Sequence, residues 1–185
     1  MLIALSGPSG IGKGFIKNML MAECPGLSEL PWLTTRLPRQ DESLIGNRTF
    51  VNGAEFDDLD CVLVQSLYGN LYGLERKHLL PQETKRLTEI HPDNVANVLA
   101  IAPDAILIGL VTSDTSLLAE RMAGRDEEDS SLKIRLEAAY SEMELIESQR
   151  RMFHKVVEIS RDIETTKWIV HYLKTLINSE GESHA

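Results

Sequence analysis

The segment LIALSGPSGIGKG, residues 2–14, decides the fold of this chain. Its first part, residues 2–5, is an apolar run that predicts a buried strand, and a glycine-rich turn follows at once. Residues 15–23 then have a helical pattern, which ends at Pro25 and Gly26. A strand, a glycine-rich turn and a helix in this order are the context in which GxxxxGK is a phosphate-binding loop, or Walker A motif.

The residue types in this loop suit an anionic ligand. Glycines let the backbone approach a phosphate closely, so that loop N–H groups and the helix N-terminus point at it. Lys13 is placed to reach the β- and γ-phosphates of a nucleoside triphosphate, which an ordinary glycine-rich turn would not require. The predicted ATP-binding residues are Gly7, Pro8, Ser9, Gly10, Ile11, Gly12, Lys13, Gly14 and Phe15.

One group of the usual loop is missing. The common pattern continues after lysine with Ser or Thr, whose hydroxyl meets Mg²⁺, but here Gly14 and Phe15 follow Lys13. We expect Mg²⁺ as a cofactor beside ATP, held largely by water, substrate phosphates and another protein group that the sequence does not identify. Ser6 and Ser9 offer nearby hydroxyls, although neither stands at the usual position.

Composition limits the partners. The chain has 185 residues, 43% of them hydrophobic, and a formal net charge of −9 with a pI of about 5.1. Such an acidic protein is a poor candidate for binding a nucleic acid polymer or an anionic membrane. Two cysteines without metal-ligand spacing fit a reducing compartment, and the first apolar run is too short for a signal peptide. We therefore expect a cytoplasmic protein, either a monomer or a homodimer.

Short apolar runs alternate with longer amphipathic segments, which predicts an α/β layer fold. Residues 105–112 and 156–159 read as further buried strands, and residues 132–146 and 168–177 carry helical apolar stripes. Residues 32–77 are instead polar and rich in turn residues. The prediction is one domain with a parallel sheet core (1–31, 78–121 and 136–185), an insertion (32–77) and a short lid (122–135).

A basic cluster, TTRLPR at residues 34–39, is the second informative stretch. Its arginines, Arg36 and Arg39, lie three residues apart with a proline between them, and two such guanidinium groups can grip one phosphate. Two arginines alone would more often be a solvated surface, but a phosphate loop upstream favours a second phosphate site.

Four motifs in order resemble the guanylate kinase family. SGPSGIGKG is similar to its phosphate loop, TTRLPR to its TTRxPR acceptor-phosphate motif, and GNLYG at residues 69–73 to its GNxYG turn. RMAGR at residues 121–125 and IRLEAA at residues 134–139 resemble its lid. The resemblance implies a three-layer P-loop kinase fold and phosphoryl transfer from MgATP to a nucleoside monophosphate or a similar small phosphorylated acceptor.

The resemblance also implies roles for single residues. Lys13 would hold the β- and γ-phosphates, and arginines of the lid would neutralise charge on the transferring group. The implied catalytic residues are Lys13, Arg121, Arg125 and Arg135, and the implied acceptor-binding residues are Arg36, Arg39, Tyr72 and Glu89. Glu89 and His91 would stand where the family has two carboxylates.

Departures from the family collect where a guanine base would be read. The family's serine before TTR is Trp32, its base-binding glutamate is Leu63, and its hydroxyl residue after YG is Leu74. A second acceptor-phosphate tyrosine is lost around Thr49. We therefore do not expect GMP to be the preferred acceptor, because a pocket without these polar groups rejects guanine strongly. Trp32 could stack on a ring of the acceptor or serve packing.

Two other functions stay open. A guanylate-kinase-like module without catalysis would use the arginine pair to bind a phosphorylated ligand or peptide. A P-loop triphosphatase or switch protein is less attractive, since no base-specificity motif for GTP is present. The intact GxxxxGK loop favours the kinase.

Overall fold

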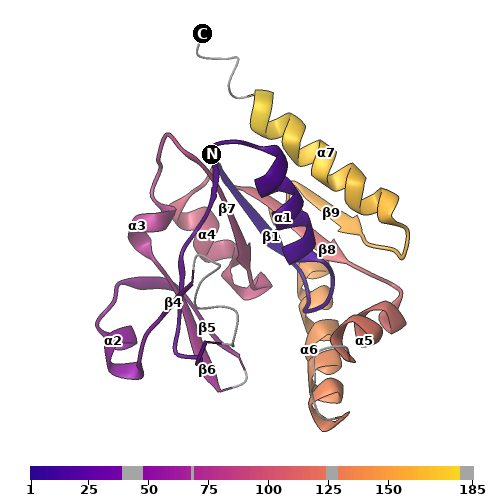
Figure 1. The fold of residues 1–185 in the computed structure, drawn as a ribbon, viewed down its shortest axis with the longest axis horizontal. Helices are drawn as coiled ribbons and strands as arrows, with labels where there is room; N and C mark the ends of the chain where they lie inside the picture. The colour runs from indigo at the N-terminus through magenta and orange to yellow at the C-terminus, as the bar shows by residue number, and fades with distance from the viewer. Residues whose placement is uncertain (39–47, 68, 124–128, 180–185) are drawn as a thin grey trace.

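The computed structural model describes residues 1–38, 48–67, 69–123 and 129–179 (Figure 1). Its core is a five-stranded sheet in the order β2-β7-β1-β8-β9, and every neighbouring pair is parallel. This confirms the predicted α/β fold with a parallel sheet. The strands are β1 (Leu2–Ser6), β2 (Leu27–Glu29), β7 (Lys85–Ile90), β8 (Ile106–Val111) and β9 (Lys155–Glu158).

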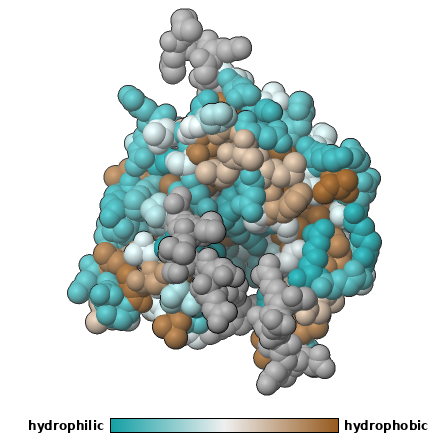
Figure 2. All heavy atoms as spheres, viewed as in Figure 1, coloured by the Kyte–Doolittle hydropathy of each residue, from teal (hydrophilic) through white to brown (hydrophobic). Residues whose placement is uncertain are grey.

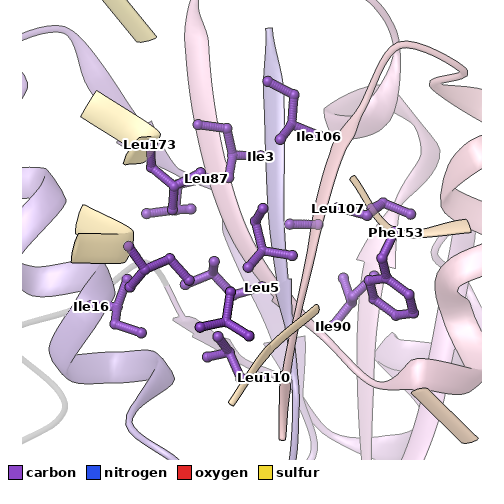
Figure 3. Close-up of a cluster of buried hydrophobic side chains, with 14 of the residues drawn as sticks. Ile3, Leu5, Ile16, Leu87, Ile90, Ile106, Leu107, Leu110, Phe153 and Leu173 are labelled. Atoms are coloured by element: carbon purple, nitrogen blue, oxygen red, sulfur yellow. The ribbon is translucent and has the colours of Figure 1, made fainter. Parts of the chain in front are cut away.

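Helices cover both faces of this sheet. Ile16 of α1 (Lys13–Glu23) and Leu173 of α7 (Ile163–Ser179) lie on one side, and Phe153 lies on the other (Figure 3). On that second side α6 (Asp129–Ser148) packs so tightly that a Cβ at Gly109 would lie 2.8 Å from Ile146. Because both faces are covered, β1 and β8 are buried at every residue, as the unbroken apolar runs predict.

A second, four-stranded sheet stands beside the core in the order β4-β3-β6-β5. All its strands fall inside the predicted insertion, whose bounds, like those of the other parts, stay a prediction. The GNLYG segment is a turn only at its start, because its last residues continue into a strand. The strands are β3 (Trp32–Thr34), β4 (Arg48–Phe50), β5 (Cys61–Leu67) and β6 (Asn70–Glu75), with α2 (Gly53–Asp57) and α3 (Arg76–Leu79) beside them.

Two more helices, α4 (Val95–Ile101) and α5 (Thr115–Ala123), complete the core. Hydrophobic side chains on the face in Figure 2 form separate groups among hydrophilic ones, as is usual for surfaces in contact with water. In the parts of the chain that the structure describes, no helix is both long and apolar enough to cross a membrane.

Candidate active site

The loop between β1 and α1 has the backbone of a phosphate-binding loop. Gly12 has φ 114°, a conformation that side chains disfavour, and it directly precedes the first residue of α1. Gly7 lies so close to β8 that a Cβ there would stand 2.7 Å from the carbonyl oxygen of Leu110. Larger residues at these two positions would distort the loop, so both glycines are needed for its shape.

Lys13 begins α1 and folds back over the loop. Its ammonium donates hydrogen bonds to the carbonyl oxygens of Gly7 and, at 3.0 Å, of Pro8. Its positive charge helps to hold the pKa of Glu89 below the ordinary value, and it opposes the rise that burial causes in the pKa of Glu142. Lys13 is therefore the cation that the loop presents to the cavity, as the motif predicts.

Two of the predicted lid arginines converge on the same loop from different helices. Arg121 of α5 donates to the carbonyl oxygens of Ile11 at 3.0 Å and Gly10 at 3.3 Å. Arg135 of α6 is buried and donates to the hydroxyl of Ser9 at 3.1 Å. Arg125 lies outside the described residues. Two guanidinium groups from different helices therefore lie against the phosphate loop.

A cavity of about 330 Å³ opens between this loop and the small sheet. Arg36, which follows β3, and Tyr72 of β6 line it together with Lys13. The Arg36 guanidinium is 5.5 Å from the ring centroid of Phe50, and its Nη1 donates to the carbonyl oxygen of Leu37 at 2.9 Å. Arg39 lies outside the described residues. Arg36 and Tyr72 therefore share one cavity with Lys13, as the resemblance implies.

The cavity contains Arg48, which the sequence reasoning missed. Arg48 pairs in register with Trp32, and both line the cavity. Phe50, two residues after Arg48 on β4, lies on the same face of the strand, where its ring is beneath the Arg36 guanidinium. Thr49, where the lost tyrosine was expected to have stood, lines a separate cavity with Leu33 on the other face. Because β4 has only three residues, the sequence pattern carries no clear signal for Arg48.

A half-buried ion cluster forms the floor of the cavity. Lys17, one turn after Lys13 on α1, lies 2.6 Å from an oxygen of Glu29 and 3.1 Å from one of Glu89. Burial opposes the charge on Glu89, but Lys13, Lys17 and Arg48 outweigh it and hold the pKa of this carboxyl below its ordinary value. Burial likewise opposes the Lys17 charge, yet Glu89 and Glu29 raise its pKa. Glu89 and Lys17 are therefore both ionised at neutral pH.

His91 and Glu142 form a second titratable pair at the cavity wall. His91 Nε2 lies 3.7 Å from Oε1 of Glu142, and His91 Nδ1 lies 3.1 Å from Asp93. Burial raises the pKa of Glu142 to about 7, and Lys13 opposes the rise. Burial lowers the pKa of His91, with Asp93 opposing and Lys13 adding to the fall. Burial therefore favours the uncharged form of both groups.

Glu142 should make stability fall as pH rises. The folded state keeps the Glu142 proton up to about pH 7, whereas the unfolded chain releases it near the ordinary value of 4.5. Its contribution is therefore present below pH 4.5 and is lost as pH rises through about 7. Between pH 5 and 8, we expect the free energy of unfolding to fall by about 2 kcal/mol more in the wild-type protein than in Glu142→Gln.

Urea unfolding of both proteins at several pH values measures this difference. Glu144→Gln, an exposed position on the same helix, is the matched control and should keep the wild-type profile. Parallel profiles for wild type and Glu142→Gln would contradict the assignment of the raised pKa.

The positions that would read guanine are apolar in the structure as well. Leu63 and Leu74 pair across β5 and β6, and both are 0% exposed, so neither reaches the cavity. Trp32 lines the cavity, packs against the core and donates its Nε1–H to the Thr88 hydroxyl at 2.8 Å. Of the β5 residues that line the cavity, Gln65 has a polar side chain and Leu67 an apolar one.

The side chains do not fit a protein-held Mg²⁺ site. Gly14 supplies no hydroxyl, the Ser9 hydroxyl accepts from Arg135, and Ser6 is fully buried outside the cavity lining. Glu89 is held by the Lys17 ammonium. Across residues 1–38, 48–67, 69–123 and 129–179 there is no group of three or more His, Cys, Asp or Glu side chains that could hold a metal ion. The metal ligand that the sequence left unidentified is not found among these side chains.

Comparisons with known proteins identify the family and the fold of the chain. No protein-family model matches the chain. The chain is 35% identical over 158 residues to the guanylate kinase of Mycoplasma mycoides, which covers 78% of this chain and 52% of that protein, so the chain spans about half of its length. It is 31% identical over 151 residues to the guanylate kinase of Trichodesmium erythraeum, covering 77% of this chain and 81% of the relative.

A third relative, the guanylate kinase of Thermobifida fusca, is 33% identical over 150 residues, covering 77% of this chain and 76% of the relative. The crystal structure of guanylate kinase from Anaplasma phagocytophilum superposes with a TM-score of 0.70 at 20% identity, covering 97% of this chain and 85% of that one. The structural match shows a shared fold, and the sequence matches to the Trichodesmium erythraeum and Thermobifida fusca proteins extend over most of both chains. The chain therefore belongs to the guanylate kinase family.

Proposed function

We propose that this protein is a guanylate-kinase-type phosphotransferase that moves the γ-phosphoryl group of ATP to a nucleoside monophosphate or a similar small phosphorylated acceptor. The observation that carries the proposal is the shared cavity, in which Lys13 of the phosphate loop faces Arg36 and Tyr72 of the small sheet. Two phosphate-binding groups on opposite walls of one cavity would hold a donor and an acceptor phosphate for direct transfer.

Each group has a role in this transfer. Lys13 holds the β- and γ-phosphates, and Arg121 and Arg135, with Arg125 of the same lid, neutralise charge on the transferring group. Arg36, Arg39 and Tyr72 bind the acceptor phosphate. Mg²⁺ enters with ATP, bound by phosphate oxygens and water. Glu89, whose carboxylate lies 3.1 Å from the Lys17 ammonium, orients the acceptor.

Arg48 adds a cation to the acceptor site. Since Arg48 lines the cavity on the same face as Arg36, we expect Arg48→Met to raise the acceptor KM about tenfold and to change kcat little. Arg76→Met, which removes an exposed arginine paired with Asp60 outside the cavity, is the control. Steady-state kinetics with the acceptor as the varied substrate decide this, and an unchanged KM would remove Arg48 from the site.

The acceptor itself is not read as guanine. Buried Leu63 and Leu74 offer no hydrogen bonds to a base, so GMP should be a poor substrate relative to at least one other acceptor. A coupled assay of ADP release across nucleoside monophosphates and sugar phosphates tests the function and this preference together. No turnover with any acceptor, at protein concentrations that bind ATP, would refute the kinase and favour a binding module.

A further inference from the structure

The floor of the cavity holds a fixed side-chain cation where the family's loop would supply a metal-binding hydroxyl. Lys17 lies on the same face of α1 as Lys13, four residues later. Its ammonium is 3.1 Å from Oε1 of Glu89, and a Cβ at Gly14 would be 4.0 Å from that same oxygen. The ammonium, the carboxylate and the position of the missing hydroxyl therefore meet at one point.

This ammonium is firmly held in its place. Only 15% of the Lys17 side chain is exposed, and Glu29 at the end of β2 binds its ammonium at 2.6 Å, in addition to Glu89 at 3.1 Å. Removing one partner from such a buried cluster leaves charge uncompensated. Without Lys17, two carboxylates would face a bound nucleotide and repel its phosphates, unless another cation took the ammonium's place.

We propose that Lys17 is a built-in cation which makes nucleotide binding by this protein nearly independent of Mg²⁺. The inference rests on the proposed function, since it concerns the same phosphate site. Lys17 binds both Glu29 and Glu89, and together with Lys13 and Arg48, which also act on Glu89, it leaves the floor of the site with more positive than negative side-chain charge. The site therefore does not need a metal ion to neutralise its floor. Lys17 acts through these carboxylates and through the field at the phosphates, and is a positioning residue.

The test measures ADP binding by titration calorimetry in excess MgCl₂ and in EDTA. For the wild-type protein we expect the two Kd values to agree within about threefold. For Lys17→Met we expect binding in EDTA to be weaker than in MgCl₂ by about tenfold or more. Lys17→Arg keeps the cation and should retain the wild-type ratio.

A merely structural ion cluster would behave differently. Lys17→Met would then lower the melting temperature and leave the ratio of the two Kd values unchanged, which would overturn the inference. The inference would also be overturned if the wild-type protein bound ADP at least about tenfold more weakly in EDTA than in MgCl₂. Lys174→Met, which removes an exposed partner of Glu23 at the far end of α1, controls for loss of an ordinary ion pair.

Failure of the proposed function gives a distinct result. If the wild-type protein binds ADP under neither condition, the nucleotide site itself is refuted, and the role of Lys17 falls with it. If ADP binds and the ratio is the same in wild type and Lys17→Met, only the role of Lys17 is refuted.

Discussion

Lys13→Ala is expected to lower kcat by about a thousandfold or more, the largest effect of any single substitution in this chain. Phosphoryl transfer depends almost entirely on positioning and on neutralising charge, and Lys13 is the cation at the start of α1 that the loop presents to the cavity. Steady-state turnover with ATP and the best acceptor measures the loss.

The matching control is Lys167→Ala, which removes an exposed lysine paired with Glu164 on α7, remote from the cavity. It should turn over at the wild-type rate. Circular dichroism and melting temperature should show that Lys13→Ala is folded. A folded Lys13→Ala protein that retains kcat within tenfold of wild type would contradict the role of the loop.

Arg135→Met is expected to lower kcat by about a hundredfold, with a smaller effect on ADP binding. Arg135 is only 6% exposed and donates to the Ser9 hydroxyl of the phosphate loop, although it comes from α6 far along the chain. Methionine keeps much of the side-chain volume but removes the charge, so the loss reports on neutralisation of the transferring group.

Lys133→Met lies on the same helix and removes a cation whose side chain is 82% exposed, so it serves as the control. Stopped-flow or steady-state kinetics should separate the two variants by their kcat values. Equal kcat values for Arg135→Met and Lys133→Met would mean that Arg135 stabilises the loop through Ser9 and does not act on the transferring group.

Much of the core could be predicted from the sequence because local and tertiary preferences agree there. Apolar runs at β1 and β8 are buried on both faces, so they need no alternation to be recognised as strands. The glycine-rich turn between β1 and α1 fixes the order of elements around it. The apolar stripe of α7 likewise packs against the sheet, where Leu173 is 0% exposed.

The small sheet could not be predicted in the same way. β3 and β4 have three residues each, too few for a period to emerge, and they pair in parallel although residues 35–47 separate them in the sequence. Their stability comes from pairing with each other and with β6 rather than from their own composition. Sequence reasoning therefore reads this region as polar and turn-rich.

The site residues that were missed share a cause. Matching a sequence to family motifs identifies only the residues that the motifs contain. It therefore misses functional side chains at positions that belong to no motif. Lys17 follows Lys13 by one helical turn, and Glu142 follows Arg135 by two, so helical spacing places each on the face of a residue already identified. Spacing from known site residues would have found both, whereas Arg48 required the strand to be recognised.

The central claim is direct transfer between the two phosphate sites of one cavity. Phosphorus NMR of a mixture of protein, ATP and the acceptor panel measures it most directly, because it resolves ATP, ADP, inorganic phosphate and the acceptor product. The account predicts that ADP and one newly phosphorylated acceptor appear in equal amounts, and that neither appears with Lys13→Ala. ADP accompanied only by inorganic phosphate, or ATP that binds but stays intact with every acceptor, would contradict it.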